Sequence, residues 1–311
     1  MDNPLSRDST LFRLTEELYS IQVESVQDFE RQHKDPVVNL VLTSGEGDRY
    51  FLKQIQPHSM RPELEEIYSR LGGLKTDGYR LILPLIAKSG KALFEHQGVP
   101  FVLMKFEEIA PFSSARVDCS KMISILSDFH AKVSAFPIQR QSHRSFEGWL
   151  RRGPEQIRKR FGDGMPFVSH LEDYLRERLP AFTFREGIIH WDVHRHNFGI
   201  GTRGELLILD FDLLQPGALA CDLLLLVPIY RDQEQRVISI AETVLDLVLS
   251  ELKKVILIRP GSDGSEFGRQ DLKYLVGRRL MMDVWDWPEV DARKNEVVDY
   301  LKEIEIWVER T

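Results

Sequence analysis

The sequence predicts an α+β fold with a small, sheet-rich first half and a larger, mainly helical second half. Up to residue 106, runs of β-branched and aromatic residues alternate with short links, and one stretch has helical spacing. From residue 120 the apolar residues recur at helical spacing, interrupted by one further hairpin. The period changes near Pro111, which predicts a first lobe of residues 1–108 and a second lobe of residues 109–311.

The strands of the first half follow in order. Runs rich in branched residues cover 20–26 and 37–43. The turn SGEGD at 44–48 joins the second run to a further strand at 49–55, which predicts a hairpin. The stretch 62–71 starts with Pro62 and repeats apolar residues on one face, which predicts a helix that Gly72 and Gly73 end. Three further strands are predicted at 80–86, 91–96 and 99–106, followed by a strap that crosses to the second half.

The second half begins with a predicted helix whose N-cap is Ser120. Later in the chain, residues 197–200 and 205–211 flank the turn GTRG, which predicts a second hairpin with Gly201 and Gly204 in its turn. The polar stretch before this hairpin and Asp210 at the end of its second strand are therefore expected at the same end of the hairpin.

Composition and charge exclude several classes of protein. The chain has 311 residues, a net charge of −7 and a pI of about 5.8. A protein that binds nucleic acid requires concentrated positive charge, so we expect no nucleic-acid partner. Cys119 and Cys221 form no C-x-x-C pattern, so we expect two reduced thiols. The first ten residues are polar, unlike a secretory signal, and the longest apolar run, 223–229, is too short to span a bilayer. We therefore expect a cytoplasmic protein without a membrane partner.

One stretch concentrates groups that carry chemistry. GIIHWDVHRHNFGI, residues 187–200, places His190, Asp192, His194, His196 and Asn197 between two apolar runs. Three interpretations fit this pattern: a metal-dependent hydrolase that binds zinc or iron through the imidazoles and Asp192, a loop for phosphoryl transfer, or a hydrogen-bonded turn without chemistry.

Phosphoryl transfer explains residues that the other two interpretations leave aside. It requires a carboxylate near the attacking hydroxyl, oxygen ligands for Mg²⁺ and a lysine near the phosphates. Asp192, Asn197 and Asp210 fit the first two requirements, and Lys53, on the strand after the first turn, fits the third.

These motifs resemble those of the aminoglycoside phosphotransferase and choline kinase-like family. HWDVHRHN and LLILDFD resemble its H-x-D-x-H-x-x-N and I-D-F/W-D/E signatures, YFLKQ its lysine strand and FVLMKFEE its hinge strand. LSDFHAKV resembles the family's helix that ends in Phe-His and precedes the catalytic loop, and ALACDLLLL resembles the family's A-x-x-D-L segment. The resemblance implies a two-lobed, protein-kinase-like fold and a kinase that moves the γ-phosphate of ATP or GTP to a small molecule with Mg²⁺.

The resemblance also implies a role for each matching residue. Asp192 would orient the acceptor hydroxyl and accept its proton, Asn197 and Asp210 would bind Mg²⁺, and Lys53 would contact the phosphates. A glutamate of the helix at 62–71 would pair with Lys53, and we expect Glu63 rather than Glu66, because Glu63 lies nearer the apolar face.

The remaining roles concern the nucleotide base and the support of the loop. Backbone groups of Lys105 and Glu107 would hold the base, with Met104 at the back of the pocket. Asp222 and His190 would brace the loop. Because the hinge would contact the base through backbone groups, the resemblance is compatible with either ATP or GTP as the nucleotide.

Two features depart from the family pattern. Trp191 stands where the family usually has Gly or another small residue, and the segment between the first two strands, ERQHKDPVV, has no glycine to hold phosphates. These departures keep an alternative open, a kinase-fold binding protein that transfers no phosphate.

The acceptor is predicted only as a class, a small molecule that bears a hydroxyl group. The acidic net charge and the mixed aromatic and acidic segment 281–291 favour a cationic acceptor, and aminoglycosides belong to that class. The basic run 151–162 is expected to be a solvated helix face.

Overall fold

A computed structural model describes residues 9–29, 38–56, 63–113, 117–138, 158–159, 166–230, 238–260, 266–283 and 294–310. The chain divides into two compact units. Unit 1 contains Met1–Pro111 and Phe198–Leu213, and unit 2 contains Phe112–Asn197 and Leu214–Thr311. The segment ERQHKDPVV up to Val37, most of the basic run 151–162 and most of segment 281–291 lie outside the described residues.

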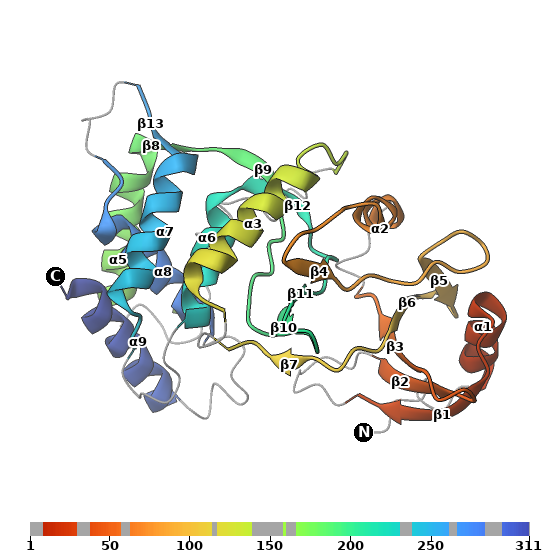
Figure 1. Cartoon of the computed structure of the whole chain (residues 1–311). Helices are drawn as coiled ribbons and strands as arrows, with labels where there is room; N and C mark the ends of the chain where they lie inside the picture. The colour runs from red at the N-terminus through yellow and green to blue at the C-terminus, as the bar shows by residue number, and fades with distance from the viewer. Residues whose placement is uncertain are drawn as a thin grey trace. The chain divides into compact units, whose positions relative to one another are not determined.

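Unit 1 is built on a five-stranded antiparallel sheet (Figure 1). Its strands lie in the order β1 (Val23–Asp28), β2 (Asn39–Ser44), β3 (Arg49–Gln54), β6 (Val99–Lys105) and β5 (Leu93–His96). The predicted hairpin of β2 and β3 is confirmed, with Asn39 paired to Lys53 and Thr43 to Arg49. The run 80–86 forms a strand only at β4 (Tyr79–Leu81), and Pro84, which has no N–H to donate, makes an isolated bridge to Met104.

The two faces of this sheet have different partners. Leu40, Leu52 and Phe101 belong to a buried cluster that also includes Leu11 of helix α1 (Ser9–Tyr19). Because side chains alternate along a strand, Lys53 points to the opposite face from Leu52. Helix α1 was not predicted, although Leu11, Leu14, Thr15 and Leu18 have helical spacing.

A smaller four-stranded sheet completes unit 1. Its order is β4, β11 (Leu206–Ile208), β10 (Phe198–Ile200) and β7 (Ala110–Pro111). The predicted hairpin of β10 and β11 is confirmed, and Gly204, with φ of +79°, donates its N–H to Gly201 O at 2.9 Å in the turn. Phe198 pairs with Ile208, so residues 209–213 leave the sheet at the end where β10 begins.

Helix α2 (Leu64–Gly72) is the predicted helix of unit 1. Its buried face consists of Leu64, Ile67, Tyr68 and Leu71, at the spacing that one side of a helix requires. Its backbone ends at the two glycines, where the N–H of Gly73 is directed at the carbonyls of Arg70 and Leu71. Tyr68 therefore extends its hydroxyl into the interior of unit 1.

Unit 2 is mainly helical (Figure 1). Its described helices are α3 (Cys119–Val133), α5 (Pro166–Arg178), α6 (Ala220–Leu226), α7 (Glu242–Val255), α8 (Arg269–Asp283) and α9 (Lys294–Glu309), with short 3₁₀ turns at Leu179–Ala181 and Val227–Tyr230. The predicted N-cap of α3 was wrong: Asp118, not Ser120, caps this helix, because its side chain accepts a hydrogen bond from Lys121 N at 2.8 Å.

Two strand pairs in unit 2 were not predicted. β9 (Glu186–Ile189) pairs with β12 (Gln215–Ala218), and β8 (Phe182–Phe184) pairs with β13 (Ile256–Ile258). The first pair links the polar stretch to α6, all of whose residues are buried. Within the described ranges, every helix is too short or too polar to cross a membrane.

Candidate functional site

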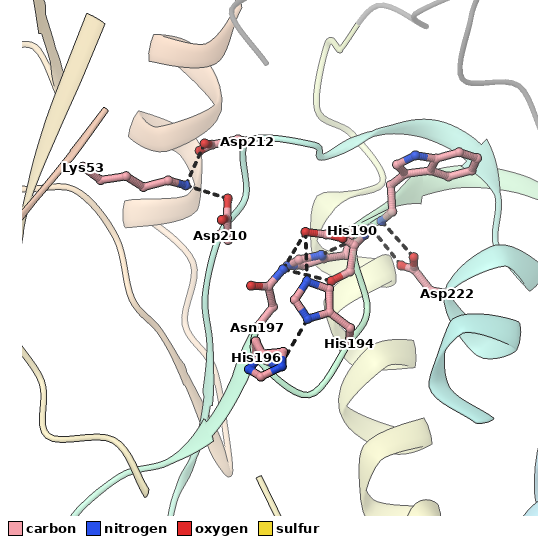
Figure 2. Close-up of polar contacts among 10 residues, drawn as sticks. Lys53, His190, His194, His196, Asn197, Asp210, Asp212 and Asp222 are labelled. Atoms are coloured by element: carbon pink, nitrogen blue, oxygen red, sulfur yellow. Dashed lines mark hydrogen bonds and ion pairs between the residues drawn. The ribbon is translucent and has the colours of Figure 1, made fainter. Parts of the chain in front are cut away.

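Lys53 lies in a compact group of charged side chains within unit 1. Its Nζ lies 2.8 Å from Asp210 Oδ1 and 2.7 Å from Asp212 Oδ2 (Figure 2). The Tyr68 hydroxyl from α2 donates a hydrogen bond to Asp212 Oδ1. We call Lys53, Tyr68, Asp210 and Asp212 the lysine cluster.

The lysine cluster excludes water from most of its contacts. Lys53, Tyr68 and Asp212 are each no more than 6% exposed, whereas the Asp210 side chain is 20% exposed. Burial alone would lower the pKa of Lys53, but the carboxylates of Asp210 and Asp212 outweigh it and raise that pKa above its ordinary value. Lys53 is therefore a permanent cation at neutral pH.

The two carboxylates of the cluster differ in their surroundings. Burial raises the pKa of Asp212, the Lys53 ammonium opposes this, and the neighbouring Asp210 carboxylate adds to it. Asp210 has a backbone φ of +61°, a conformation that side-chain-bearing residues rarely adopt. Two carboxylates against one ammonium leave an excess of negative charge, which suits a divalent cation.

The glutamates of the α2 region have other contacts. Glu66 accepts two hydrogen bonds from Arg70, at 2.9 and 2.7 Å. Glu65 accepts from the backbone N–H groups of Ala92 and Leu93, next to the start of β5. Glu63 stands at the N-cap position of α2. The carboxylates that contact Lys53 in this structure are those of Asp210 and Asp212.

The residues predicted for base recognition lie at the end of β6. Met104 pairs with Phe51 in the sheet, on the same face as Lys53, and Lys105 is the last residue of the strand. Glu107, just beyond it, accepts hydrogen bonds from Arg80 at 2.8 and 3.1 Å. The side chain of Glu107 is thus engaged with Arg80 inside unit 1. The predicted contact with the nucleotide base involves only the backbone of Glu107 and does not need this side chain.

The polar stretch forms a loop in unit 2, residues 190–197, whose start is held by Asp222. This fully buried carboxylate accepts hydrogen bonds from His190 N at 2.7 Å (Figure 2) and from Trp191 N at 2.9 Å. It also lies 2.8 Å from His130 Nε2. His190 is also fully buried, and the Asp192 N–H is directed at His190 Nδ1 at 3.3 Å. One carboxylate thereby fixes two successive backbone amides.

Trp191 has an unusual backbone at this point. Its φ is +67°, in the left-handed region that favours glycine. The indole packs beside a small buried cluster of Ile189, Ala218 and Cys221. The hydrogen bonds to Asp222 and this packing maintain a conformation that would otherwise be unfavourable by about 1–3 kcal/mol.

Asp192 lies at the centre of the 190–197 loop. Its Oδ2 accepts a hydrogen bond from Asn197 Nδ2 at 2.7 Å and lies 3.3 Å from His194 Nε2, and its side chain is 34% exposed. Burial raises the pKa of Asp192, but the hydrogen bonds from His194 and Asn197 and the charge of the neighbouring imidazoles outweigh it and hold the pKa well below its usual range. Asp192 is therefore ionised at neutral pH.

Asn197 connects the loop to the hairpin of unit 1. Its Nδ2 donates to both the backbone oxygen and the side chain of Asp192, at 3.0 and 2.7 Å. Both hydrogen bonds come from the amide nitrogen, so the amide oxygen is directed away from Asp192. An amide oxygen and a carboxylate oxygen are the donor types that Mg²⁺ prefers, so the chemistry of Asn197 and Asp210 fits this ion.

The imidazoles of the loop do not gather around one point. His194 and His196 pack edge to face, with ring centroids 5.7 Å apart, and His190 lies buried against Phe129. Across the described part of the chain, no three His, Cys, Asp or Glu side chains form a group that could hold a metal ion. This arrangement gives no support to the zinc or iron hydrolase interpretation.

The sequence patterns missed two members of the lysine cluster. Asp212 is the last acidic position of the quoted LLILDFD signature and follows Asp210 by two residues. Helical spacing placed Tyr68 on the apolar face of α2, and its ring is indeed buried there. The acidic last position of the signature was a signal for Asp212, whereas the hydroxyl contact of Tyr68 depends on tertiary structure.

The fold and these side chains define a two-lobed, kinase-like protein, and solved structures with the same fold support this class. The chain resembles a microcompartment-associated aminopropanol kinase with a TM-score of 0.64 and 18% identity, covering 97% of each chain. It resembles an amicoumacin kinase in complex with AMP-PNP and Ca²⁺, with a TM-score of 0.60, 14% identity, and 96% and 93% of the chains covered. It also resembles the choline kinase LicA from Streptococcus pneumoniae, with a TM-score of 0.58, 14% identity, and 96% and 99% covered.

The family follows from a sequence match. The sequence profile of the phosphotransferase enzyme family (APH) matches residues 31–246, more than half of the chain. This protein therefore belongs to the phosphotransferase enzyme family, as its motifs indicated. No curated protein sequence matches it.

Proposed function

We propose that this chain is a Mg²⁺-dependent kinase that moves the γ-phosphate of ATP or GTP to a hydroxyl group of a small molecule. The proposal rests on the side-chain contacts that the structure shows around each of the two signature motifs. Lys53 is held by Asp210 and Asp212 in unit 1, and an ionised Asp192 is held by Asn197 and His194 in unit 2. Family membership and the nucleotide bound to the amicoumacin kinase support the same reaction.

Asp192 would act on the acceptor. An ionised, one-third exposed carboxylate accepts a hydrogen bond from a hydroxyl group and so fixes the direction of its oxygen. Because its pKa is held low, Asp192 is a weak base in the free protein, and we propose that it takes the proton only as the oxygen–phosphorus bond forms. Asn197 and His194 would keep the carboxylate in place for this step.

The nucleotide would be held by residues of the first lobe, 1–108, and we propose that the second lobe, 109–311, supplies the acceptor pocket. Lys53 would pair with phosphate oxygens as a point charge. The backbone of Lys105 and Glu107 would hold the base beside Met104. His190 and Asp222 would maintain the loop that presents Asp192.

Asn197 and Asp210 would hold the magnesium ion through oxygen atoms. When bound, this ion neutralises charge on the phosphate oxygens. Mg²⁺ usually has one or two protein oxygens, water and substrate phosphates as ligands, which agrees with the small number of donors proposed here.

We further propose a cationic acceptor, and a cytoplasmic enzyme, since a kinase needs a supply of nucleotide and Mg²⁺. The net charge of −7 favours cations near the protein surface. The names of two structural relatives point the same way, because aminopropanol combines an amine with a hydroxyl group and choline is a quaternary amine. Amino alcohols and aminoglycosides therefore come first among the acceptors to be tested.

The test is a transfer assay with purified protein, Mg²⁺ and either ATP or GTP, across a panel of amino alcohols, aminoglycosides and sugars. We expect acceptor-dependent release of nucleoside diphosphate that EDTA stops and that Asp192→Ala or Asp210→Ala abolishes. Asp128→Asn, which alters a half-exposed pair with Lys132 on α3, is the matched control. If both active-site variants keep full activity, the roles are wrong, and if no Mg²⁺–nucleotide raises the thermal stability of the wild type, the protein is a binding module without transfer.

A further inference from the structure

We infer that the Asp212 carboxylate, anchored to α2 by the Tyr68 hydroxyl, is the group that positions Lys53 for the nucleotide phosphates. This role is the one that the family resemblance assigns to a glutamate of the α2 region. The inference rests on the proposed function, because it specifies how one residue of that site is held. Asp212 and Tyr68 are positioning residues in this proposal and touch no substrate.

Both oxygens of Asp212 already accept from protein donors. Oδ2 is 2.7 Å from Lys53 Nζ, and Oδ1 accepts from the Tyr68 hydroxyl. Lys53, Tyr68 and Asp212 are 6%, 5% and 4% exposed, so water competes little for these contacts. A hydrogen bond between ionised groups in such surroundings is short and directional, and it fixes the ammonium at one point.

Asp210 is suited to a different task. It shares Lys53 with Asp212 at a similar distance, 2.8 Å, but its side chain is 20% exposed whereas that of Asp212 is 5% exposed. A carboxylate that reaches solvent can accept a hydrated ion, whereas the enclosed carboxylate of Asp212 cannot do so without breaking its contact with Tyr68 or Lys53. The structure thus divides the two acids of the signature into an ion-binding one and a lysine-holding one.

Tyr68 provides the link to the helix. It lies on the buried face of α2 with Leu64, Ile67 and Leu71, and among these four it alone has a polar tip. The charged residues of α2 on either side are used elsewhere, Glu65 at β5 and Glu66 with Arg70. The position of α2 is therefore transmitted to Lys53 by a hydroxyl group and a carboxylate in series, rather than by one long acidic side chain.

The inference predicts separable effects of three variants. We expect Asp212→Asn to weaken binding of metal-free nucleotide about tenfold, because it removes the charge that contacts the ammonium directly. Tyr68→Phe should weaken it about threefold, because the hydroxyl acts on Lys53 only through Asp212. In both variants the Mg²⁺ concentration for half-maximal turnover should stay within about twofold of the wild type, because neither residue binds the ion. Asp210→Asn should raise that concentration about tenfold or more.

The experiment measures nucleotide affinity by calorimetry in EDTA and the Mg²⁺ dependence of turnover for each variant. Tyr19→Phe is the matched control for the tyrosine, since its hydroxyl donates to Ala92 O in unit 1, outside the lysine cluster. Tyr68→Phe also keeps the test valid if Asp212→Asn fails to fold. An Asp212→Asn protein that needs as much extra Mg²⁺ as Asp210→Asn, or a Tyr68→Phe protein that binds metal-free nucleotide like the wild type, would overturn the inference. A wild type that binds no nucleotide would instead overturn the proposed function, and this inference with it.

Discussion

In the lysine cluster, charged side chains from distant parts of the chain contact one another directly, whereas in the 190–197 loop one buried carboxylate holds the backbone. Lys53 lies more than 150 residues before Asp210 and Asp212, which it contacts. Asp222 instead accepts from the amides of His190 and Trp191, and the side chain of Asp192 remains one-third exposed. Charge in the first region is thus mostly enclosed by its own partners, while the carboxylate of Asp192 in the second region remains partly open to solvent.

The largest expected effect is on transfer, from Asp192→Asn. Removing the charge that we propose orients the acceptor hydroxyl should lower kcat about a thousandfold, within the range for loss of a general base. The free energy of unfolding should change by less than about 1 kcal/mol, because the side chain is partly exposed and an amide oxygen can still accept from Asn197. Rapid-quench transfer assays and urea unfolding measure the two quantities. A large loss of stability with little loss of kcat would reverse the assignment.

The lysine cluster should show the opposite behaviour in Lys53→Ala. This change leaves the buried Asp212 and its neighbour Asp210 without their shared cation, so we expect unfolding to become easier by about 3–5 kcal/mol. Urea unfolding checks this, with Lys132→Ala as control, because Lys132 pairs with Asp128 at a more exposed position. The control should lose only about 0.3–0.5 kcal/mol. A loss below about 1 kcal/mol in Lys53→Ala would show that the cluster adds little to stability.

The same contrast explains what the sequence could predict. The 190–197 loop is local, so the residue types and their fixed spacing already place Asp192 and Asn197 close together, and the structure shows them in contact. The strands and the two hairpins follow from residue alternation and glycine turns. The partners of Lys53 depend on contacts across more than 150 residues, so local spacing does not reveal them. The family resemblance pointed to Glu63, in preference to Glu66, and missed Asp212 and Tyr68.

The remaining differences between prediction and structure have local causes. The strand pairs β8–β13 and β9–β12 are only three or four residues long, and such short runs carry almost no periodic signal. Helix α1 does have helical spacing, but its 11 residues contain no acidic residue in the first turn and no basic residue in the last, two of the usual signals of helix ends.

A smaller effect should distinguish backbone strain from packing at Trp191. Trp191→Gly and Trp191→Ala both remove the indole from the cluster of Ile189, Ala218 and Cys221, so they differ mainly in the cost of a φ of +67°. We expect the glycine variant to be more stable than the alanine variant by about 1 kcal/mol. Thermal unfolding of both proteins gives this difference.

The control for this pair is Ser124, an exposed residue inside α3. There alanine should be more stable than glycine by about 1 kcal/mol, the reverse order, because a helix favours alanine. If position 191 also favours alanine, the hydrogen bonds to Asp222 do not enforce the left-handed backbone, and the loop relaxes when the indole is removed.

The smallest effect should come from Glu66→Ala on the exposed face of α2. The pair with Arg70 is about half exposed on both sides, so its loss should cost about 0.3–0.5 kcal/mol. Nucleotide affinity should stay within about twofold of the wild type, since Lys53 has its carboxylates from the hairpin. Calorimetry with Mg²⁺ and nucleotide on Glu66→Ala and Glu63→Ala compares the two glutamates. A tenfold loss in Glu63→Ala would mean that the helix glutamate replaces Asp212 at Lys53 once nucleotide binds, and that the lysine cluster describes only the free protein.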